Sequence, residues 1–334
     1  MNWFSIWLDP KTGRLRSGWR AVVYLIASLF MTLMVYITAL SAYTLFLHAP
    51  PPPTSYASEL IPRLSAIIGF VMIAVVALRY FEQLPPYTLG LHLDGGRQLV
   101  ALTGGFGLGV GIILAVLLIL YPLHLVTFRL APFTPQMLQE VGLGAAGFLI
   151  LGVFEEVLFR GYFFQTLLRG AGPFVTLLLT AALFTAAHLG NPNNTLLAGA
   201  NIFLAGIVFG CLYLRHGSLW LPIGVHAGWN VALLFFQIPI SGITLAITTP
   251  VSATITGSSL ITGGAFGLEG GVCISCVLLG LIYALTHLKV GLPLDSNWWE
   301  WRDFAATRTP PPVWDFTIDA RHYQWKLLPQ DPLE

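Results

Sequence analysis

Five ionisable side chains interrupt apolar stretches of this sequence: Glu155, Glu156, Arg160, His188 and His226. A charge at bilayer depth costs at least about 2.5 kcal/mol, so such residues face the interior of a helix bundle and are candidates for function. The first three share one apolar segment, and each histidine lies on a later one. Their spacing therefore indicates which of them can act together.

The two adjacent glutamates point in different directions on a helix. Glu156 and Arg160 are spaced i, i+4, which places them on one helical face where they can form an ion pair. We interpret this pair as a structural clamp. Glu155 is rotated by about 100° from Glu156 and faces another neighbour. It is the freer carboxylate and the candidate general base.

Glu155 and His188 are expected at the same depth in the membrane. A turn is predicted at 170–172, where the chain reads Gly-Ala-Gly before a proline. Glu155 lies about 15 residues before this turn and His188 about 16 after it, which at 1.5 Å per residue places both roughly 24 Å from the turn.

The third apolar segment brings two more polar residues to this layer. Counted from Gly217, which is expected on the same side of the membrane as the 170–172 turn, His226 lies about 14 Å deep and Asn230 about 20 Å deep. They are one helical turn apart and share a face. Four polar side chains from three helices are thus predicted to meet in one layer.

This polar layer is compatible with two kinds of chemistry. In a catalytic set, Glu155 would activate a water molecule while His and Asn donors stabilise the oxyanion of a tetrahedral intermediate. In a metal site, Glu155, His188 and His226 would supply three ligands and leave a fourth position for water. The H-E-x-x-H motif of many zinc proteases does not occur in the sequence. The residues leave both alternatives open.

The composition places these residues in a membrane protein. The chain is 56% hydrophobic and 9% charged, with a mean hydropathy of +0.76, so it lacks the polar surface of a soluble protein of its size. We expect membrane lipid as its surroundings. The 16 basic and 15 acidic residues give no concentrated positive charge, so nucleic acid is not expected as a partner.

The apolar segments predict an all-α fold, a polytopic transmembrane helix bundle of about eight spans. The expected spans are 21–47, 60–78, 99–123, 141–168, 173–189, 196–214, 218–237 and 269–288. Basic residues follow every second segment and precede the first, which predicts that both termini are cytoplasmic. We expect an integral, multi-pass protein of a prokaryotic plasma membrane.

Four regions are predicted along the chain. They are a cytoplasmic N-terminal segment at 1–20, N-terminal transmembrane helices at 21–140, a transmembrane core at 141–290 that carries the polar residues, and a polar C-terminal tail at 291–334. The glycines at 104, 105, 107, 109 and 111 are typical of close helix packing. A phosphate-binding loop would instead need a strand before it.

Three short motifs resemble a known family. Glu155-Glu156-x-x-x-Arg160, Phe184-x-x-x-His188 and His226-x-x-x-Asn230 occur in this order on successive apolar segments. Together they resemble the CPBP family of intramembrane proteases, which includes the CAAX prenyl endopeptidases and bacteriocin-immunity relatives. The resemblance covers about residues 145–235.

The resemblance implies an intramembrane endopeptidase acting on a membrane-associated peptide or protein. It implies that Glu155 activates the attacking water with the help of His188, that His226 and Asn230 form the oxyanion hole, and that Glu156 and Arg160 support the site. The family is commonly called metalloproteases, but a metal-free glutamate mechanism fits the same residues. We therefore leave the cofactor open between a divalent metal such as Zn and none.

The substrate and the function class also have alternatives. The predicted topology places the polar layer nearer the extracytoplasmic face, whereas a prenylated C-terminal peptide would be cytoplasmic, so CAAX processing is the weaker inference. A non-catalytic immunity or scaffold protein would keep the polar layer for helix association. A proton-coupled transporter would use Glu155 and His188 as a relay. We found no inverted repeat in the sequence, which disfavours the transporter.

Overall fold

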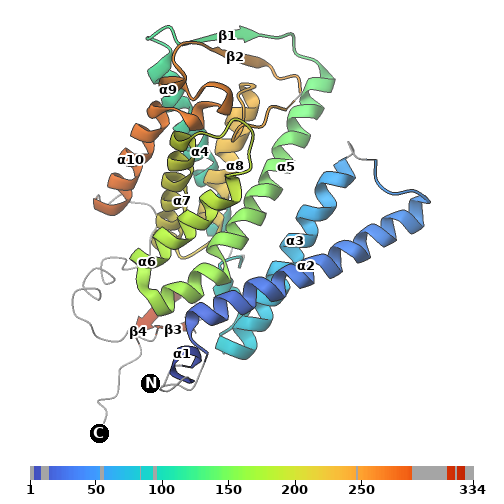
Figure 1. The fold of residues 1–334 in the computed structure, drawn as a ribbon, viewed down its shortest axis with the longest axis vertical. Coiled ribbons are helices and arrows are strands. Elements are labelled where there is room, and N and C mark those ends of the chain that lie inside the picture. The colour runs from blue at the N-terminus through green and yellow to red at the C-terminus, as the bar shows by residue number, and fades with distance from the viewer. Residues whose placement is uncertain are drawn as a thin grey trace.

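The computed structural model describes residues 4–8, 15–52, 56–82, 84–92, 96–245, 247–287, 314–319 and 322–327. About 76% of the structure is helical, which confirms the predicted all-α class (Figure 1). The α-helices are α1 Phe4–Trp7, α2 Ser17–Leu47, α3 Tyr56–Val76, α4 Arg97–Leu120, α5 Pro135–Arg160, α6 Tyr162–His188, α7 Leu196–His216, α8 Trp220–Phe235, α9 Ser259–Thr262 and α10 Val272–His287. Shorter helical elements are the π-helix η1 Ala77–Glu82 and the 3-10 turns η2 Pro86–Leu89, η3 Gly264–Phe266 and η4 Leu268–Gly270.

Five helical segments of the described chain are long and apolar enough to cross a membrane. They are Ser17–Leu47, Leu60–Glu82, Arg97–Leu120, Pro135–His188 and Leu196–His216. The helices α8 and α10 are apolar but have only 16 residues each. Every apolar stretch predicted to span is therefore helical, although the last two form shorter helices than expected.

The prediction of one continuous helix over 141–168 is wrong. The helix α5 begins earlier and ends at Arg160, and Gly161 separates it from α6 with backbone angles of φ −71° and ψ −138°. A Cβ atom at Gly161 would lie 2.3 Å from the Val157 carbonyl oxygen, so only glycine fits this break. The turn predicted at 170–172 is present as a kink in α6, where Gly172 has a φ of 75°. Beyond it, the second part of α6 runs back along the bundle (Figure 1).

The helices α4 and α8 pack in backbone contact through glycines on both sides. Cβ atoms at Gly105 and Gly109 of α4 would lie 2.5 and 2.1 Å from carbonyl oxygens of α8. Cβ atoms at Gly224 and Gly228 of α8 would lie 2.2 and 2.1 Å from carbonyl oxygens of α4. The i, i+4 glycine pairs therefore interlock, as in closely packed membrane helices. This confirms the predicted packing role for Gly105 and Gly109.

Two short strand pairs occur among the described residues. The strands β1 Val126–Leu130 and β2 Val251–Ile255 pair antiparallel, with Val126 opposite Ile255, and connect the loop after α4 to the loop after α8. The strands β3 Trp314–Asp319 and β4 His322–Leu327 form a second antiparallel pair within the predicted tail. The remaining residues of 291–334 lie outside the described part of the chain.

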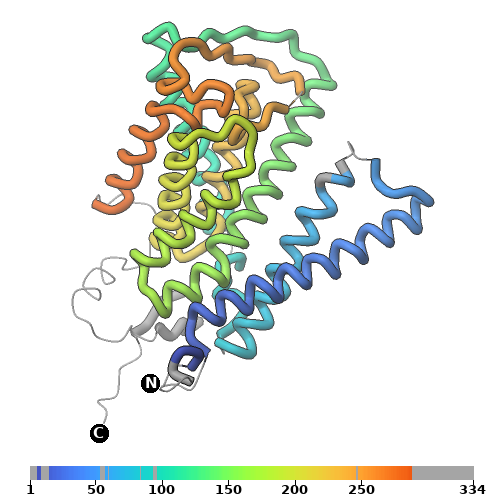
Figure 2. Tube along the Cα trace, viewed as in Figure 1, coloured from blue at the N-terminus to red at the C-terminus, as the bar shows by residue number. Residues whose placement is uncertain are grey.

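The hairpin of α2 and α3 lies at one side of the bundle (Figure 2). Polar contacts of Glu82 hold one end of it. The carboxylate of Glu82, at the end of η1, lies 2.5 Å from the guanidinium of Arg20 on α2 and 3.5 Å from that of Arg169 on α6. It also accepts a hydrogen bond of 2.8 Å from the Tyr162 hydroxyl. The Glu82 side chain is only 5% exposed, so these contacts compensate a largely buried charge.

We expect Gly109→Ala to lower the thermal unfolding midpoint of the purified protein in detergent. The added methyl group would overlap the backbone of α8, and overpacking of this kind costs about 1–3 kcal/mol. Gly107→Ala is the matched control, because a Cβ atom at Gly107 meets nothing within 4 Å. The control should be neutral or gain up to about 1 kcal/mol from helix propensity. Equal effects of both substitutions would contradict the packing assigned to Gly109.

Candidate active site

A cavity of about 920 Å³ lies between the helices α3, α5, α6, α7, α8 and α10. Its walls are mostly apolar, and the polar side chains on them include Glu155, His188, His226 and Asn230. The structure thus brings the four residues of the predicted layer to one space. Glu156 and Arg160 do not line the cavity and lie fully buried behind it.

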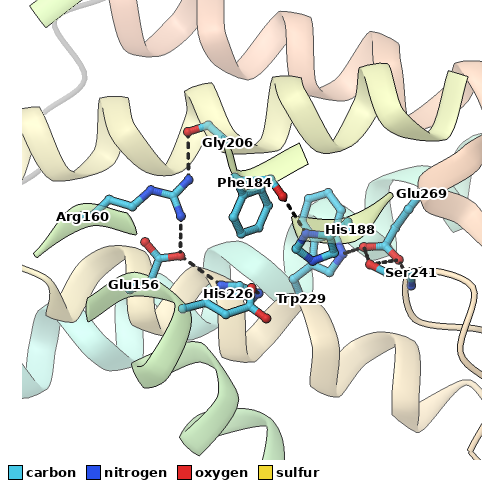
Figure 3. A network of polar contacts seen from close by, with 10 residues as sticks. Glu156, Arg160, Phe184, His188, Gly206, His226, Trp229, Ser241 and Glu269 are labelled. Atoms are coloured by element: carbon cyan, nitrogen blue, oxygen red, sulfur yellow. Dashed lines mark hydrogen bonds and ion pairs between the residues drawn. The ribbon is translucent and has the colours of Figure 1, made fainter. Parts of the chain in front are cut away.

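The Arg160 guanidinium is compensated inside the protein. Its Nη1 donates to Glu156 Oε1 at 3.1 Å, and its Nη2 donates to the Gly206 carbonyl oxygen at 3.0 Å (Figure 3). Both charged side chains are 0% exposed. The guanidinium also lies over the rings of Phe184 and Phe209, at 4.8 and 5.2 Å from their centroids. The i, i+4 ion pair predicted from the sequence is therefore present.

His226 lies between the two glutamates of the first motif. Its Nδ1 donates to Glu156 Oε1 at 3.0 Å, and its Nε2 lies 3.6 Å from Glu155 Oε2. The ring stacks on Phe209 with centroids 4.8 Å apart. Because an ionised carboxylate can only accept hydrogen bonds, this position suits an imidazolium with an N–H at both nitrogens. Glu156 therefore holds the histidine ring as well as the arginine.

Glu155 differs from its neighbour in exposure and bonding. Its side chain is 14% exposed and lines the cavity, whereas that of Glu156 is fully buried. The Oε2 atom of Glu155 receives no hydrogen bond from any described residue. That oxygen is itself buried and lies 3.6 Å from His226 Nε2. The prediction that Glu155 and Glu156 have different neighbours is wrong for His226, which contacts both, whereas the ion pair with Arg160 is formed by Glu156.

His188 has one ring nitrogen fixed by the helix that carries it. Its Nδ1 lies 2.8 Å from the Phe184 carbonyl oxygen, which can only accept, so Nδ1 carries a proton. In the neutral ring, Nε2 then keeps its lone pair. The Phe184 ring contacts the His188 ring, with centroids 4.6 Å apart, and also the Arg160 guanidinium. The four-residue spacing of Phe184 and His188 thus links the histidine to the buried ion pair.

One family model matches part of the chain. Residues 137–232 match the model described as "Type II CAAX prenyl endopeptidase Rce1-like". This segment is an Rce1-like domain of the CPBP family of intramembrane proteases. No curated protein and no solved structure matches the chain. The matched segment contains all six predicted site residues, and its family is a protease family. With the long apolar helices, the match indicates an integral membrane protein.

Sequence reasoning missed a second carboxylate in the cavity, which lies outside the Rce1-like domain. Glu269 belongs to the turn η4, is 8% exposed and lines the cavity. The predicted span 269–288 begins at this residue, but α10 begins at Val272. Burial raises the pKa of Glu269 above its usual range, while hydrogen bonds from Ser241 and Trp229 act in the opposite direction. The signal for Glu269 in the sequence was a single acidic residue at the beginning of a predicted span.

The described residues do not form a ready metal site. No group of three His, Cys, Asp or Glu side chains among them lies close enough to hold an ion. Glu155 and His226 are neighbours, but His226 uses Nδ1 for Glu156, and His188 does not complete a three-ligand cluster with them. The predicted ligand set of Glu155, His188 and His226 therefore does not fit a metal ion as arranged.

We expect Arg160→Met to destabilise the Rce1-like domain strongly. Removing one partner of a buried ion pair leaves the other charge uncompensated and costs about 3–5 kcal/mol. Adding Glu156→Gln removes that charge too, so the double variant should recover part of the loss. Unfolding of wild type, the two single variants and the double variant, measured in one detergent, gives the coupling energy. Additive losses would contradict a coupled pair.

Proposed function

We propose that the protein is an intramembrane endopeptidase whose catalytic base is Glu155. The observation that carries this proposal is the meeting of Glu155, His188, His226 and Asn230 on the wall of one largely apolar cavity. The family match makes peptide-bond hydrolysis the expected chemistry, and the contacts of these side chains suggest a role for each.

The attacking water would be activated at Glu155. Its side chain is 14% exposed and lines the cavity, so the carboxylate can accept a proton from a water molecule held there. His188 lines the same cavity with its Nδ1 held by a backbone carbonyl. Its Nε2 lone pair can accept a hydrogen bond from the same water and orient it. The water oxygen then attacks the carbonyl carbon of the scissile bond.

The oxyanion of the tetrahedral intermediate would be stabilised by His226 and Asn230. The Nε2–H of an imidazolium at His226 and the side-chain N–H of Asn230 are the donors, one helical turn apart on α8. A donor that carries a positive charge makes a stronger hydrogen bond to an oxyanion than a neutral one. Glu156 supports this state because it accepts from Nδ1 of the same ring.

The second half of the reaction uses the same proton. When the intermediate collapses, the C–N bond breaks and the amine takes the proton that Glu155 received from water. Glu155 returns to its ionised form, and the products are a carboxylic acid and an amine. The buried Glu156 and Arg160 take no part in these transfers and hold the two histidines in place.

The substrate we propose is a membrane-associated peptide or protein. Apolar residues of α3 and α5, including Leu60, Leu143, Phe148 and Phe154, form much of the cavity wall and suit an apolar chain. A prenylated CAAX-type peptide is one candidate, because the matched family is described by that substrate. We propose a prokaryotic plasma membrane as the location, and the loop charges support both termini being cytoplasmic.

We expect Glu155→Gln to reduce cleavage of membrane-anchored and prenylated reporter peptides by about 10²- to 10⁴-fold, the usual contribution of a general base. Glu140→Gln is the matched control, because Glu140 lies on the same helix but does not line the cavity. Purified variants of equal stability should be compared. Retained cleavage by Glu155→Gln would refute the role of Glu155, and a wild type that cleaves no reporter would favour a scaffold or immunity protein.

Cleavage should be unaffected by a chelator if Glu155 acts as the base without a metal. The measurement is the initial rate of the wild-type protein before and after dialysis against a strong chelator, with zinc added back. An unchanged rate supports the glutamate mechanism. A rate that falls and is restored by zinc would instead assign Glu155, His188 and His226 as ligands that move together when the ion binds.

A further inference from the structure

The two cavity carboxylates outside the ion pair with Arg160 have opposite hydrogen-bonding states. Glu155 has an oxygen that receives no hydrogen bond from the described residues. Glu269 has donors on both oxygens: the Trp229 indole on Oε1, and the backbone N–H of Ser241 on Oε2 (Figure 3). A carboxylate with an unbonded oxygen can still accept a further hydrogen bond, whereas a carboxylate with donors on both oxygens holds other parts of the protein. The two residues therefore serve different purposes.

The donors around Glu269 come from two separate segments. The Trp229 Nε1–H donates at 3.0 Å from α8. Ser241, in the loop after α8, donates its backbone N–H, and its hydroxyl lies 3.2 and 3.3 Å from the two carboxylate oxygens. An ionised carboxylate is purely an acceptor and can take all three bonds. A glutamine would place an N–H₂ group, which is a donor, against at least one of these donors.

The backbone of Glu269 is itself fixed by a third segment. The side-chain amide of Asn201, on α7, donates to the carbonyl oxygens of Glu269 and Gly271 at 2.8 and 2.9 Å. The hydroxyl of Ser275, on α10, donates to the other end of the Asn201 amide at 2.6 Å. The carboxylate is thus held at a defined place relative to α7 and α10. Its contacts with Trp229 and Ser241 transmit that position to α8 and the following loop.

The contact with Trp229 bears on the proposed oxyanion donors. Trp229 directly precedes Asn230 and lies three residues after His226 on α8. Rotation or sliding of α8 would move all three side chains together. Gly224 and Gly228 fix the opposite side of α8 against α4, and the indole hydrogen bond fixes the side that faces the cavity.

We propose that Glu269 is a positioning residue of the active site. Through Trp229 it sets the place of His226 and Asn230, and through Ser241 it holds the loop after α8 that lines the cavity. The inference rests on the proposed function, because it assigns a role in that reaction. It adds a residue beyond the Rce1-like domain, which ends at residue 232.

The test compares Glu269→Gln with wild type in a reporter-cleavage assay. We expect kcat to fall by about 10- to 100-fold, as for a misplacement of catalytic groups by about 1 Å, while KM changes less than about twofold. Glu140→Gln is the matched control: Glu140 also accepts a hydrogen bond from a loop backbone N–H, that of Thr248 at 2.9 Å, but lies outside the cavity. A raised KM with an unchanged kcat would overturn the proposal, because it would mean that Glu269 binds substrate.

A second variant tests the route through Trp229 and covers the case in which Glu269→Gln does not fold. Trp229→Phe removes the indole donor and keeps the carboxylate with its Ser241 bonds. It should also lower kcat, and the double variant should lose little more than the worse single variant, because both break one contact. A wild-type kcat in Trp229→Phe would overturn the proposed route. So would a double variant whose loss of kcat equals the product of the two single losses.

Hydrogen exchange at Ser241 gives a readout that needs no activity. The backbone amides of the peptide covering 238–245 should exchange faster in Glu269→Gln than in wild type. In Glu140→Gln, their exchange rate should equal that of wild type. Equal exchange in all three proteins would overturn the contact on which the inference rests. A wild type that cleaves nothing refutes the proposed function, whereas a cleaving wild type with normal kcat in Glu269→Gln refutes only the role of Glu269.

Discussion

The complete burial of Arg160 constrains the rest of the site. A guanidinium without solvent must have its charge and its N–H groups compensated by the protein. Glu156 and the Gly206 carbonyl provide hydrogen bonds, and the rings of Phe184 and Phe209 face the cation. These partners come from α5, α6 and α7, so the guanidinium fixes three helices relative to one another. The same partners contact the two histidines, which is why the site depends on a residue that does not reach the cavity.

Two interruptions of regular helical geometry bring the residues around Arg160 together. A continuous helix through residue 161 would continue α5 straight on, and the second part of α6 would not return along the bundle. The break at Gly161 and the kink at Gly172 provide the two changes of direction. The close packing of α4 and α8 then leaves the other face of α8 directed toward the cavity. Glycine is needed at these points because the backbones lie too close for a Cβ atom, or because φ is positive.

The cavity is lined in part by residues outside the segment that matches the family model. Residues 137–232 supply the six polar residues of the three motifs, but α3, the loop after α8 and the turn η4 complete the walls. The α2/α3 hairpin is anchored through Glu82 at one end, while the beginning of α3 reaches the cavity at Leu60. The flanking elements thus shape the space that a substrate would enter.

The sequence by itself determined the helical class, the apolar segments and the pairing of Glu156 with Arg160, because hydropathy and an i, i+4 spacing are local properties. The count of rise per residue predicted a common layer for Glu155, His188 and His226, but it assumed a continuous helix across Gly161, where the structure has a break. Only the tertiary structure decided that His226 lies between both glutamates, since lateral positions depend on how helices rotate and pack. It also placed Glu269 in the cavity, because a turn that brings a residue back over the bundle leaves no periodic signal in the chain.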